Sequence, residues 1–248
     1  MTRLYADDAF LYDIAFDWDI EEEVDWLVDR LAAASVLEPG CGSGRMLVAL
    51  AGRGIEVVGL DSSPAMVALA SSRLGGVGQV VQADMTAFDL GRTFHGAVCP
   101  INTLLHLTPE QLAAHLECTA RHLQPLSRYL VQVGLVDPEQ RETFADSHWE
   151  SSRGDTALRL SWLDEETDLV QGISRQRSRI EVLTGPRAGE VVEEVHELTA
   201  WTPATWAAAL ETSPFEEAAT YDGGKRGQWP RVGPEATGGL LWHELTLS

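Results

Sequence analysis

The chain has 248 residues, 44% of them hydrophobic, which is enough for one large α/β domain with an insertion and a full core. Its 38 acidic residues outnumber its 18 lysines and arginines, and the formal net charge is −20. A surface this acidic is soluble and repels phosphate backbones, which argues against nucleic acid as a partner and is compatible with cationic ligands such as amines.

Membrane and metal functions are not expected either. No apolar run approaches the roughly 20 residues that a membrane-spanning helix needs, and the first eight residues are polar and acidic, unlike a secretory signal. The three cysteines, Cys41, Cys99 and Cys118, have neither metal-ligand spacing nor the pattern of a disulfide framework. We therefore predict a cytoplasmic protein that has no metal site and no membrane partner.

The first half of the chain alternates strands with helices. Residues 1–20, rich in aromatic residues and aspartates, are predicted to form a lid, and residues 21–145 a core domain. The apolar spacing predicts a helix over 21–33, and strands are expected at 35–37, 55–60, 77–82, 94–99 and 129–133. Ser62-Ser63-Pro64 and Thr108-Pro109 are typical starts of the helices between them. This alternation predicts a doubly wound, mostly parallel sheet.

The second half changes character at about residue 146. Residues 156–163, 169–183 and 190–200 alternate apolar with polar side chains, and the glycine- and proline-rich stretch 184–189 is typical of a hairpin loop. We expect an antiparallel meander over 146–200 that serves as a substrate wall or as the surface of a possible homodimer. A helix from Thr202-Pro203 and strands at 215–221 and 240–247 would complete the core sheet within 201–248.

A glycine-rich turn follows the first strand. Glu38 ends that strand, and Gly40, Gly42 and Gly44 follow at alternate positions before a helix begins. Glycine lets a ligand approach the backbone closely, and the start of the helix adds unpaired N–H groups. A dinucleotide-binding turn would place its third glycine one position later, so a NAD(P) oxidoreductase is the weaker reading. A purely structural turn also remains open.

Carboxylates follow the next two strands. Asp61, at the end of the second strand, is placed to accept both hydroxyls of a ribose, although it is also a candidate cap for the next helix. Asp84 and Met85 follow the third strand, where the carboxylate would accept from an adenine amine and the methionine would flank the ring. In this order the three features favour an adenosyl ligand.

Together these motifs resemble the class I S-adenosylmethionine-dependent methyltransferases. The resemblance covers 38–44, 59–66, 82–85 and 97–107, in the family's order and spacing. It implies an α/β fold with a doubly wound, mostly parallel, seven-stranded Rossmann-like sheet whose last strand is antiparallel, and S-adenosylmethionine as the cofactor. The implied cofactor contacts are Tyr12, Trp18, Glu38, Gly40, Cys41, Gly42, Gly44, Asp61, Ser62, Met66, Asp84, Met85 and Pro100. Cys41 also reads as a small packing residue within the turn.

The second half is more loosely similar to small-molecule N-methyltransferases of the amino-sugar type. That similarity implies active-site roles for His106, as the group able to take a proton, and for Tyr5, as a lid residue. A helix-capping histidine and a core aromatic are the respective structural alternatives. Asn102 would orient the acceptor or bond to local backbone, and His196 is a further candidate for the pocket.

Arg175, Arg177 and Arg179 share one face of a predicted strand. They would either bind an acidic substrate, with Arg175 as the candidate contact, or form cross-strand ion pairs with the glutamates at 193, 194 and 197. The hairpin pairing favours the ion pairs.

The sequence thus predicts an enzyme that transfers a methyl group to a small molecule, most plausibly to an amine nitrogen of a metabolite or natural product. O-methylation of a natural-product hydroxyl and non-catalytic binding of S-adenosylmethionine are the alternatives. A hydroxyl acceptor would depend more strongly on His106 as a base than an amine would.

Overall fold

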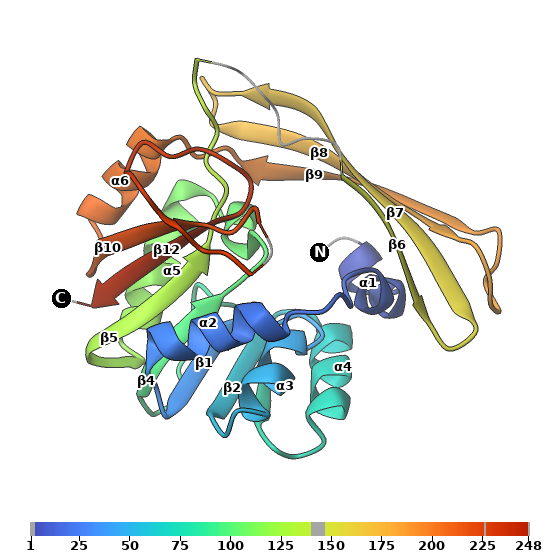
Figure 1. Cartoon of the computed structure of the whole chain (residues 1–248), viewed down its shortest axis with the longest axis horizontal. Helices are drawn as coiled ribbons and strands as arrows, with labels where there is room; N and C mark the ends of the chain where they lie inside the picture. The colour runs from blue at the N-terminus through green and yellow to red at the C-terminus, as the bar shows by residue number, and fades with distance from the viewer. Residues whose placement is uncertain (1–2, 140–146, 226, 248) are drawn as a thin grey trace.

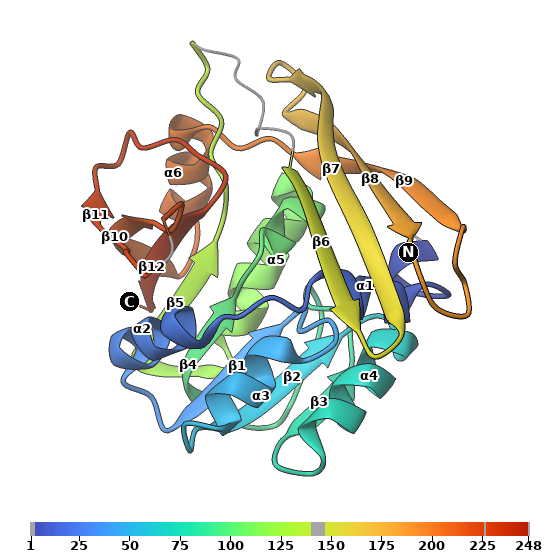
Figure 2. The same cartoon turned by 45° about the vertical axis from the view of Figure 1, so that its right-hand side comes forward.

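The computed structural model describes residues 3–139, 147–225 and 227–247. Its main sheet has eight strands in the order β11-β10-β12-β5-β4-β1-β2-β3. Figures 1 and 2 show this sheet and, beside it, a second sheet of four strands. The strands of the main sheet are β1 (Ser35–Pro39), β2 (Glu56–Asp61), β3 (Gln79–Gln82), β4 (Phe94–Cys99), β5 (Leu123–Gln132), β10 (Phe215–Asp222), β11 (Arg231–Val232) and β12 (Leu241–Leu247).

The directions of these strands confirm the predicted doubly wound arrangement. Strands β3, β2, β1, β4 and β5 are parallel neighbours, whereas β12 runs antiparallel to both β5 and β10. The predicted count of seven strands is one short, because the two-residue β11 pairs with the edge of β10. Such a short strand, in a segment rich in glycine and proline, leaves no periodic pattern in the sequence.

Helices cover both faces of the main sheet. On one face lie α2 (Glu21–Leu31), α3 (Arg45–Ala51) and α4 (Pro64–Leu74), and on the other α5 (Pro109–Ala120) and α6 (Pro203–Glu211), each set packing on its own apolar core. Local sequence fixes three of their starts. Ser63 caps α4 by accepting from the Met66 N–H, and Thr108 and Thr202 form capping boxes, each with a proline in the first turn.

The second sheet is the predicted antiparallel meander. It contains β6 (Ser147–Arg153), β7 (Thr156–Asp168), β8 (Ile173–Val182) and β9 (Val191–Thr199), in sequence order. Its inner face packs against the short helices η1 (Arg3–Tyr5) and α1 (Ala9–Ala15), which lie between it and the main sheet in Figure 1. The N-terminal segment is therefore part of a small core of its own. Within the described ranges, no helix is long and apolar enough to cross a membrane.

Candidate active site

A cavity of about 1150 Å³ lies between the carboxyl ends of the parallel strands and the inner face of the four-stranded sheet. Both the cofactor motifs and the acceptor candidates of the sequence analysis contribute to its wall. The predicted residues that line it are Tyr5, Tyr12, Trp18, Gly40, Gly42, Asp61, Ser62, Met66, Asp84, Met85, Asn102 and His106. Glu38, Cys41, Gly44, Pro100, Arg175 and His196 are not among its lining residues.

The glycine turn forms the floor of the cavity. Gly40, Gly42 and Gly44 all have positive φ, between +53° and +79°, which side chains rarely adopt. A Cβ atom on Gly40 would lie 2.6 Å from Cγ2 of Thr103, and one on Gly44 would lie 2.9 Å from Cβ of Ala70. Gly44 therefore serves helix packing between α3 and α4, and Gly40 makes room for Thr103. A Cβ on Gly42 would come no nearer than 3.9 Å to a residue outside its chain neighbours, the contact being with Tyr12, so Gly42 leaves open backbone that a ligand can approach.

Asp61 lies beside this floor, at the end of β2. Its Oδ2 accepts from the Gly42 N–H at 2.9 Å and its Oδ1 from the Ser63 N–H at 2.8 Å. These bonds fix a partly buried carboxylate at the cavity wall, and its burial raises the pKa. The alternative reading of Asp61 as the helix cap is wrong, because Ser63 caps α4. The carboxylate has lone pairs left for two hydroxyls of a ribose.

Asp84 and Met85 form the adjoining wall. Oδ1 of Asp84 accepts from both the backbone N–H and the hydroxyl of Thr86, at 2.8 and 2.7 Å, which fixes the direction of the carboxylate. The sulfur of Met85 lies 3.7 Å from where a Cβ on Gly40 would sit, so the thioether adjoins the glycine floor. A flat apolar ring with an exocyclic amine fits between such groups.

Glu38 and Cys41 lie beneath the floor. Burial raises the pKa of Glu38, which Arg45 opposes, and Oε2 of Glu38 has no hydrogen-bond partner among the described residues. The Cys41 sulfur would lie 2.8 Å from a Cβ on Gly59, and burial raises the pKa of its thiol. Cys41 therefore fills the space above β2, as its packing interpretation predicts.

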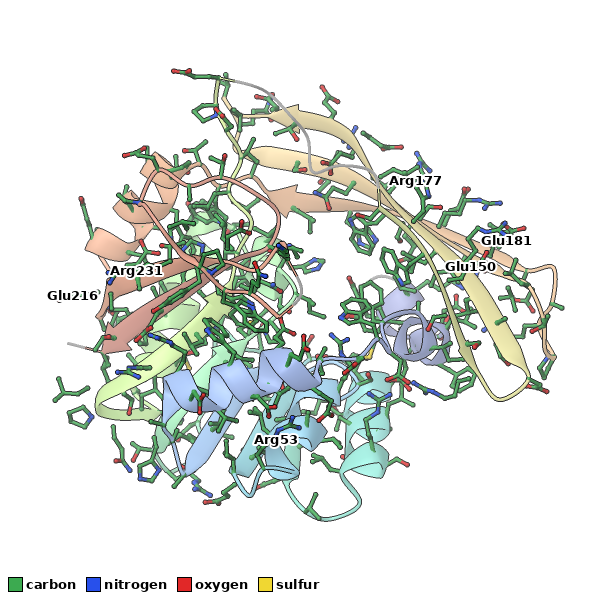
Figure 3. The ribbon with its side chains drawn as sticks, viewed as in Figure 1. Arg53, Glu150, Arg177, Glu181, Glu216 and Arg231 are labelled. Carbon is green, nitrogen blue, oxygen red and sulfur yellow. The ribbon has the colours of Figure 1, made fainter. Side chains whose placement is uncertain are left out.

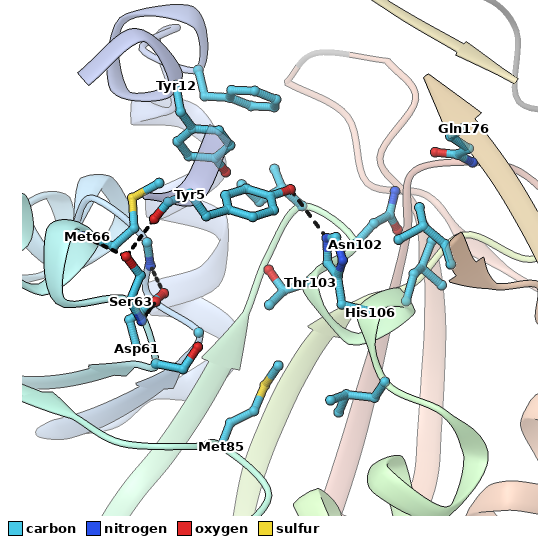
Figure 4. A pocket seen from close by; sticks show the side chains of 18 of the residues that line it. Tyr5, Tyr12, Asp61, Ser63, Met66, Met85, Asn102, Thr103, His106 and Gln176 are labelled. Atoms are coloured by element: carbon cyan, nitrogen blue, oxygen red, sulfur yellow. Dashed lines mark hydrogen bonds between the residues drawn. The ribbon is translucent and has the colours of Figure 1, made fainter. Parts of the chain in front are cut away.

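The N-terminal segment covers the cofactor side and is bonded to both halves of the molecule. The Tyr5 carbonyl accepts from the Ser63 hydroxyl at 2.5 Å, and the Leu4 N–H donates to Oε1 of Glu194 on β9 at 2.9 Å. Tyr12 stacks on Phe16 with ring centroids 4.3 Å apart, and Arg45 stacks on Trp18 at 4.3 Å. Figure 4 shows Tyr12 and Tyr5 on one side of the cavity, with Ser63 and Asp61 below them.

Tyr5 and His106 meet across the cavity. His106 ends the short helix η2 (Thr103–His106), and its Nε2 lies 3.4 Å from the Tyr5 hydroxyl (Figure 4). Desolvation within the cavity, reinforced by His196, lowers the pKa of His106 to about 4, so its imidazole is neutral at physiological pH. Burial raises the pKa of Tyr5 well above its usual value, so Tyr5 remains a phenol that can donate to His106.

Two other predicted acceptor contacts, Asn102 and His196, have structural partners. Asn102 accepts from the Gly134 N–H at 2.8 Å and donates to the Gly239 carbonyl at 2.9 Å, so its amide joins two loops at the cavity wall. His196, only 3% exposed, bonds through Nε2 to the Ser178 hydroxyl at 2.8 Å and stacks on Trp162 at 4.7 Å. It lies behind the wall, with its ring 6.2 Å from that of His106.

The arginines of β8 lie on the opposite face of the second sheet. Figure 3 shows Arg177 on the side away from α1. Arg175 pairs with Glu197 at 2.9 Å and Arg179 with Glu193 at 3.2 Å, as the ion-pair interpretation predicts, while Arg177 pairs with Glu165 instead. Alternate residues of a strand face opposite ways, so Gln176 lines the cavity and the arginines on either side of it do not.

The second sheet contributes Trp149, which the sequence offers as a candidate pocket residue, together with several lining residues that sequence reasoning missed. Trp162 donates to Oε1 of Gln176 at 2.6 Å, and Trp149 donates to the Ala15 carbonyl at 2.6 Å, so both indoles are held in place. The alternation of β7, which puts Leu158, Leu160 and Trp162 on one face, was enough to find Trp162. The other missed lining residues include Ser147, Glu150 and Asp164. Among the described residues, no three His, Cys, Asp or Glu side chains form a group that could hold a metal ion.

The residues on the glycine-turn side of this site lie in a region that matches a known protein family. Residues 36–126, which include every motif of the glycine floor and the Asp61 and Met85 walls, match the family described as "Methyltransferase domain". Over these residues the resemblance drawn from the motifs is confirmed.

One curated relative is a methyltransferase that acts on an amino sugar. The chain is 30% identical over 175 residues to dTDP-3-amino-3,6-dideoxy-alpha-D-glucopyranose N,N-dimethyltransferase of Streptomyces fradiae. That match covers 68% of this chain and 65% of the relative, just under two thirds of its length.

The fold is that of solved methyltransferases. CalS10, an amino pentose methyltransferase of Micromonospora echinaspora solved with SAM bound, aligns with a TM-score of 0.75 at 23% identity, over 96% of this chain and 97% of its own. DesVI of Streptomyces venezuelae aligns with a TM-score of 0.74 at 21% identity, over 97% of each chain. The predicted α/β class with an antiparallel insertion is confirmed, and S-adenosylmethionine is the cofactor that the matched domain supports.

Proposed function

We propose that this protein transfers a methyl group from S-adenosylmethionine to an amine nitrogen of a small molecule, such as an amino sugar of a natural product. The observation that supports this most is that one cavity joins the glycine floor and Asp61 to the facing Tyr5 and His106. The N,N-dimethyltransferase relative supports the amine as the acceptor.

The residues of the cofactor side fit an adenosyl group. In this proposal Asp61 accepts the two ribose hydroxyls, Asp84 and Met85 contact the adenine, and the backbone at Gly40 and Gly42 adjoins the amino-acid part. The bound cofactor supplies a methyl group already activated by the sulfonium charge. The task left to the protein is to align the acceptor, and orientation alone contributes about 7–11 kcal/mol.

On the acceptor side, Trp149, Trp162 and Gln176 form the wall, while Tyr5 and His106 direct the nitrogen. The neutral His106 imidazole can accept a hydrogen bond from an amine and orient its lone pair, and the proton of the methylated product leaves to solvent. A base with a pKa of about 4 is poorly matched to the deprotonation of a hydroxyl. The same geometry therefore supports an amine over the O-methylation alternative.

The test is binding followed by turnover. S-adenosylhomocysteine should bind the wild-type protein in calorimetry, and its release should be detected when S-adenosylmethionine is supplied with a panel of amino sugars. Asp61→Asn should weaken that binding about 10- to 100-fold, because a charged acceptor of two hydroxyls is lost.

Asp89→Asn is the matched control. Asp89 also accepts the N–H two residues ahead, that of Gly91 at 2.8 Å, but it is fully exposed and does not line the cavity. Equal affinities in Asp61→Asn and wild-type protein would reject the cofactor assignment. Binding without methylation of any amine, but with methylation of a hydroxyl, would transfer the assignment to the alternative.

Other predictions belong to this proposal. The acidic charge supports a cytoplasmic enzyme that does not bind nucleic acid. The outer face of the four-stranded sheet, where Val191 and Val195 are exposed beside the ion pairs, is the surface we propose for a homodimer. Sedimentation with and without a charge reversal at Glu193 would test that surface.

A further inference from the structure

We propose that Gln132 is a positioning residue for His106. Gln132 holds the turn that precedes His106, residues 100–103, in a left-handed conformation that the sequence of the turn disfavours. This inference rests on the proposed function. Gln132 is at the end of β5, only 4% exposed, and does not line the cavity.

The turn is unusual in its backbone. Ile101 has φ +48° and Asn102 has φ +58°, and the Thr103 N–H donates to the Pro100 carbonyl at 3.3 Å. Positive φ at both central positions is the pattern of a type I′ turn, which favours Asn-Gly. Asn tolerates that region, but a β-branched isoleucine there is a genuine outlier. The strain therefore resides at Ile101.

Side chains from other strands and loops hold the strained turn. Oε1 of Gln132 accepts from the Ile101 N–H at 2.7 Å, and the Asn102 amide bonds to Gly134 and Gly239. The Thr103 hydroxyl adds a bond to the Pro100 carbonyl at 2.8 Å. Strained residues of this kind persist only where the surroundings over-determine them. Among these bonds, that from Gln132 is the one made to Ile101 itself.

His106 depends directly on the turn. Asn102 is the N-cap residue of η2, its carbonyl accepts from the Leu105 N–H at 2.9 Å, and His106 occupies the last position of the helix. At the other end, the Leu107 carbonyl accepts from the Thr199 hydroxyl at 2.7 Å. A helix of a single turn has little stability of its own, so the direction of the imidazole toward Tyr5 and His196 follows the conformation of the turn.

The experiment measures the pKa of the His106 imidazole by NMR pH titration of the full chain in three variants. A further variant, His106→Asn, assigns the resonance. Wild-type His106 should titrate near pH 4. In Gln132→Leu the pKa should rise toward the ordinary 6.5, because the ring leaves its position beside the rings of Tyr5 and His196. In Ile101→Gly/Gln132→Leu it should return toward 4, since glycine adopts the turn without a clamp.

Ser127→Ala is the matched control. It removes another buried hydrogen bond of β5, that from Ser127 to the Phe94 carbonyl, at the end of the strand far from the turn, and it should leave the His106 titration unchanged. Once an accepted amine is known, Gln132→Leu should lower kcat about tenfold while KM for S-adenosylmethionine stays constant, and the double variant should recover most of kcat.

Three outcomes would overturn the proposal: an unchanged His106 titration in Gln132→Leu, no return toward 4 in the double variant, or failure of both variants to fold. If only the double variant folds, the clamp role is supported. The titration needs no acceptor, so failure of the proposed function is seen separately, as an absence of methylation with the His106 response intact.

Discussion

His115 and His106 illustrate how single side chains acquire their protonation states in this protein. His115 is completely buried, with Nδ1 2.9 Å from the Met85 carbonyl and Nε2 2.7 Å from the Tyr129 hydroxyl. A neutral imidazole satisfies both partners by donating from Nδ1 and accepting at Nε2. Burial lowers the pKa of His115 to about 4, so His115 anchors the Met85 wall as a neutral group.

This lowered pKa predicts a loss of stability in acid. The unfolded chain takes up the His115 proton below pH 6.5, while the folded protein resists it down to about 4, so the free energy of unfolding should fall across that range. His115→Gln should abolish about 2 kcal/mol of the difference between pH 7 and pH 4.5. Urea unfolding of both proteins at the two pH values measures this, and identical pH dependences would contradict the assignment.

His106 makes a prediction about the pH profile of catalysis. Because the pKa of His106 is lowered to about 4, kcat/KM should show no inflection near 6.5. It should instead rise with pH as the ammonium form of the acceptor loses its proton and becomes a nucleophile. His106→Asn should lower kcat about tenfold without changing the affinity for S-adenosylhomocysteine. Initial rates from pH 5 to pH 9 provide the measurement. An inflection near 6.5 that disappears in the variant would show that His106 titrates in the ordinary range.

Among the elements, α1 carries a buried carboxylate that pairs with arginines on two different elements. Asp13, 5% exposed, pairs with Arg73 of α4 at 2.7 Å and with Arg153 of β6. A single side chain thus joins the N-terminal segment to a helix of the main sheet and to a strand of the second sheet. The sequence showed the acidic, aromatic character of this segment, but not these partners, which are 60 and 140 residues away along the chain.

Asp13→Asn should therefore loosen the whole segment. Removing the charge leaves Arg73 and Arg153 with the more exposed Asp17 as their shared carboxylate, and it should lower the free energy of unfolding by about 2 kcal/mol. It should also speed proteolysis within the first 20 residues. Asp25→Asn, which removes an exposed ion pair with Arg53, is the control and should change stability by less than about 0.5 kcal/mol. Equal effects of the two substitutions would show that the segment is held by packing alone.

The elements also show what a sequence pattern can and cannot predict. Strands β1, β2 and β4 and the capped helices α4 and α5 carry short-range patterns, and all of them lie where the sequence placed them within a few residues. Strand β6 was missed because its residues 147–153 are mostly polar and its order depends on pairing with β7. The alternation of β7 is enough to place Trp162 on the inner face, whereas Gln176 is brought beside it by the register of β7 and β8, which no local motif encodes.

For the whole molecule, the cofactor motifs and the acceptor wall belong to different sheets. These are joined by the N-terminal segment and by the end of β9, where the Thr199 hydroxyl donates to the Leu107 carbonyl. The motifs of the first 130 residues were sufficient to infer the methyltransferase domain. Their residues lie in the glycine turn or directly after a parallel strand, and a short sequence pattern therefore fixes where each of them lies. The acceptor side was not predictable to the same depth, since its residues are assembled from 1–20, 101–107 and 147–199.

A ligand in this cavity should stabilise the folded chain as a unit. S-adenosylhomocysteine at 100 times its Kd should add about 2.7 kcal/mol, which corresponds to a rise of about 5–10 °C in Tm for a chain of this size. NAD at the same concentration should leave Tm unchanged. Differential scanning fluorimetry measures both, and a larger shift with NAD would favour the dinucleotide interpretation of the glycine turn.

All three sulfhydryl groups, those of Cys41, Cys99 and Cys118, are buried within the described structure. Alkylating reagents such as iodoacetamide should therefore leave the folded protein untouched until it unfolds. Purification and storage should need no added reductant, and the rate of labelling would report directly on how often the interior opens.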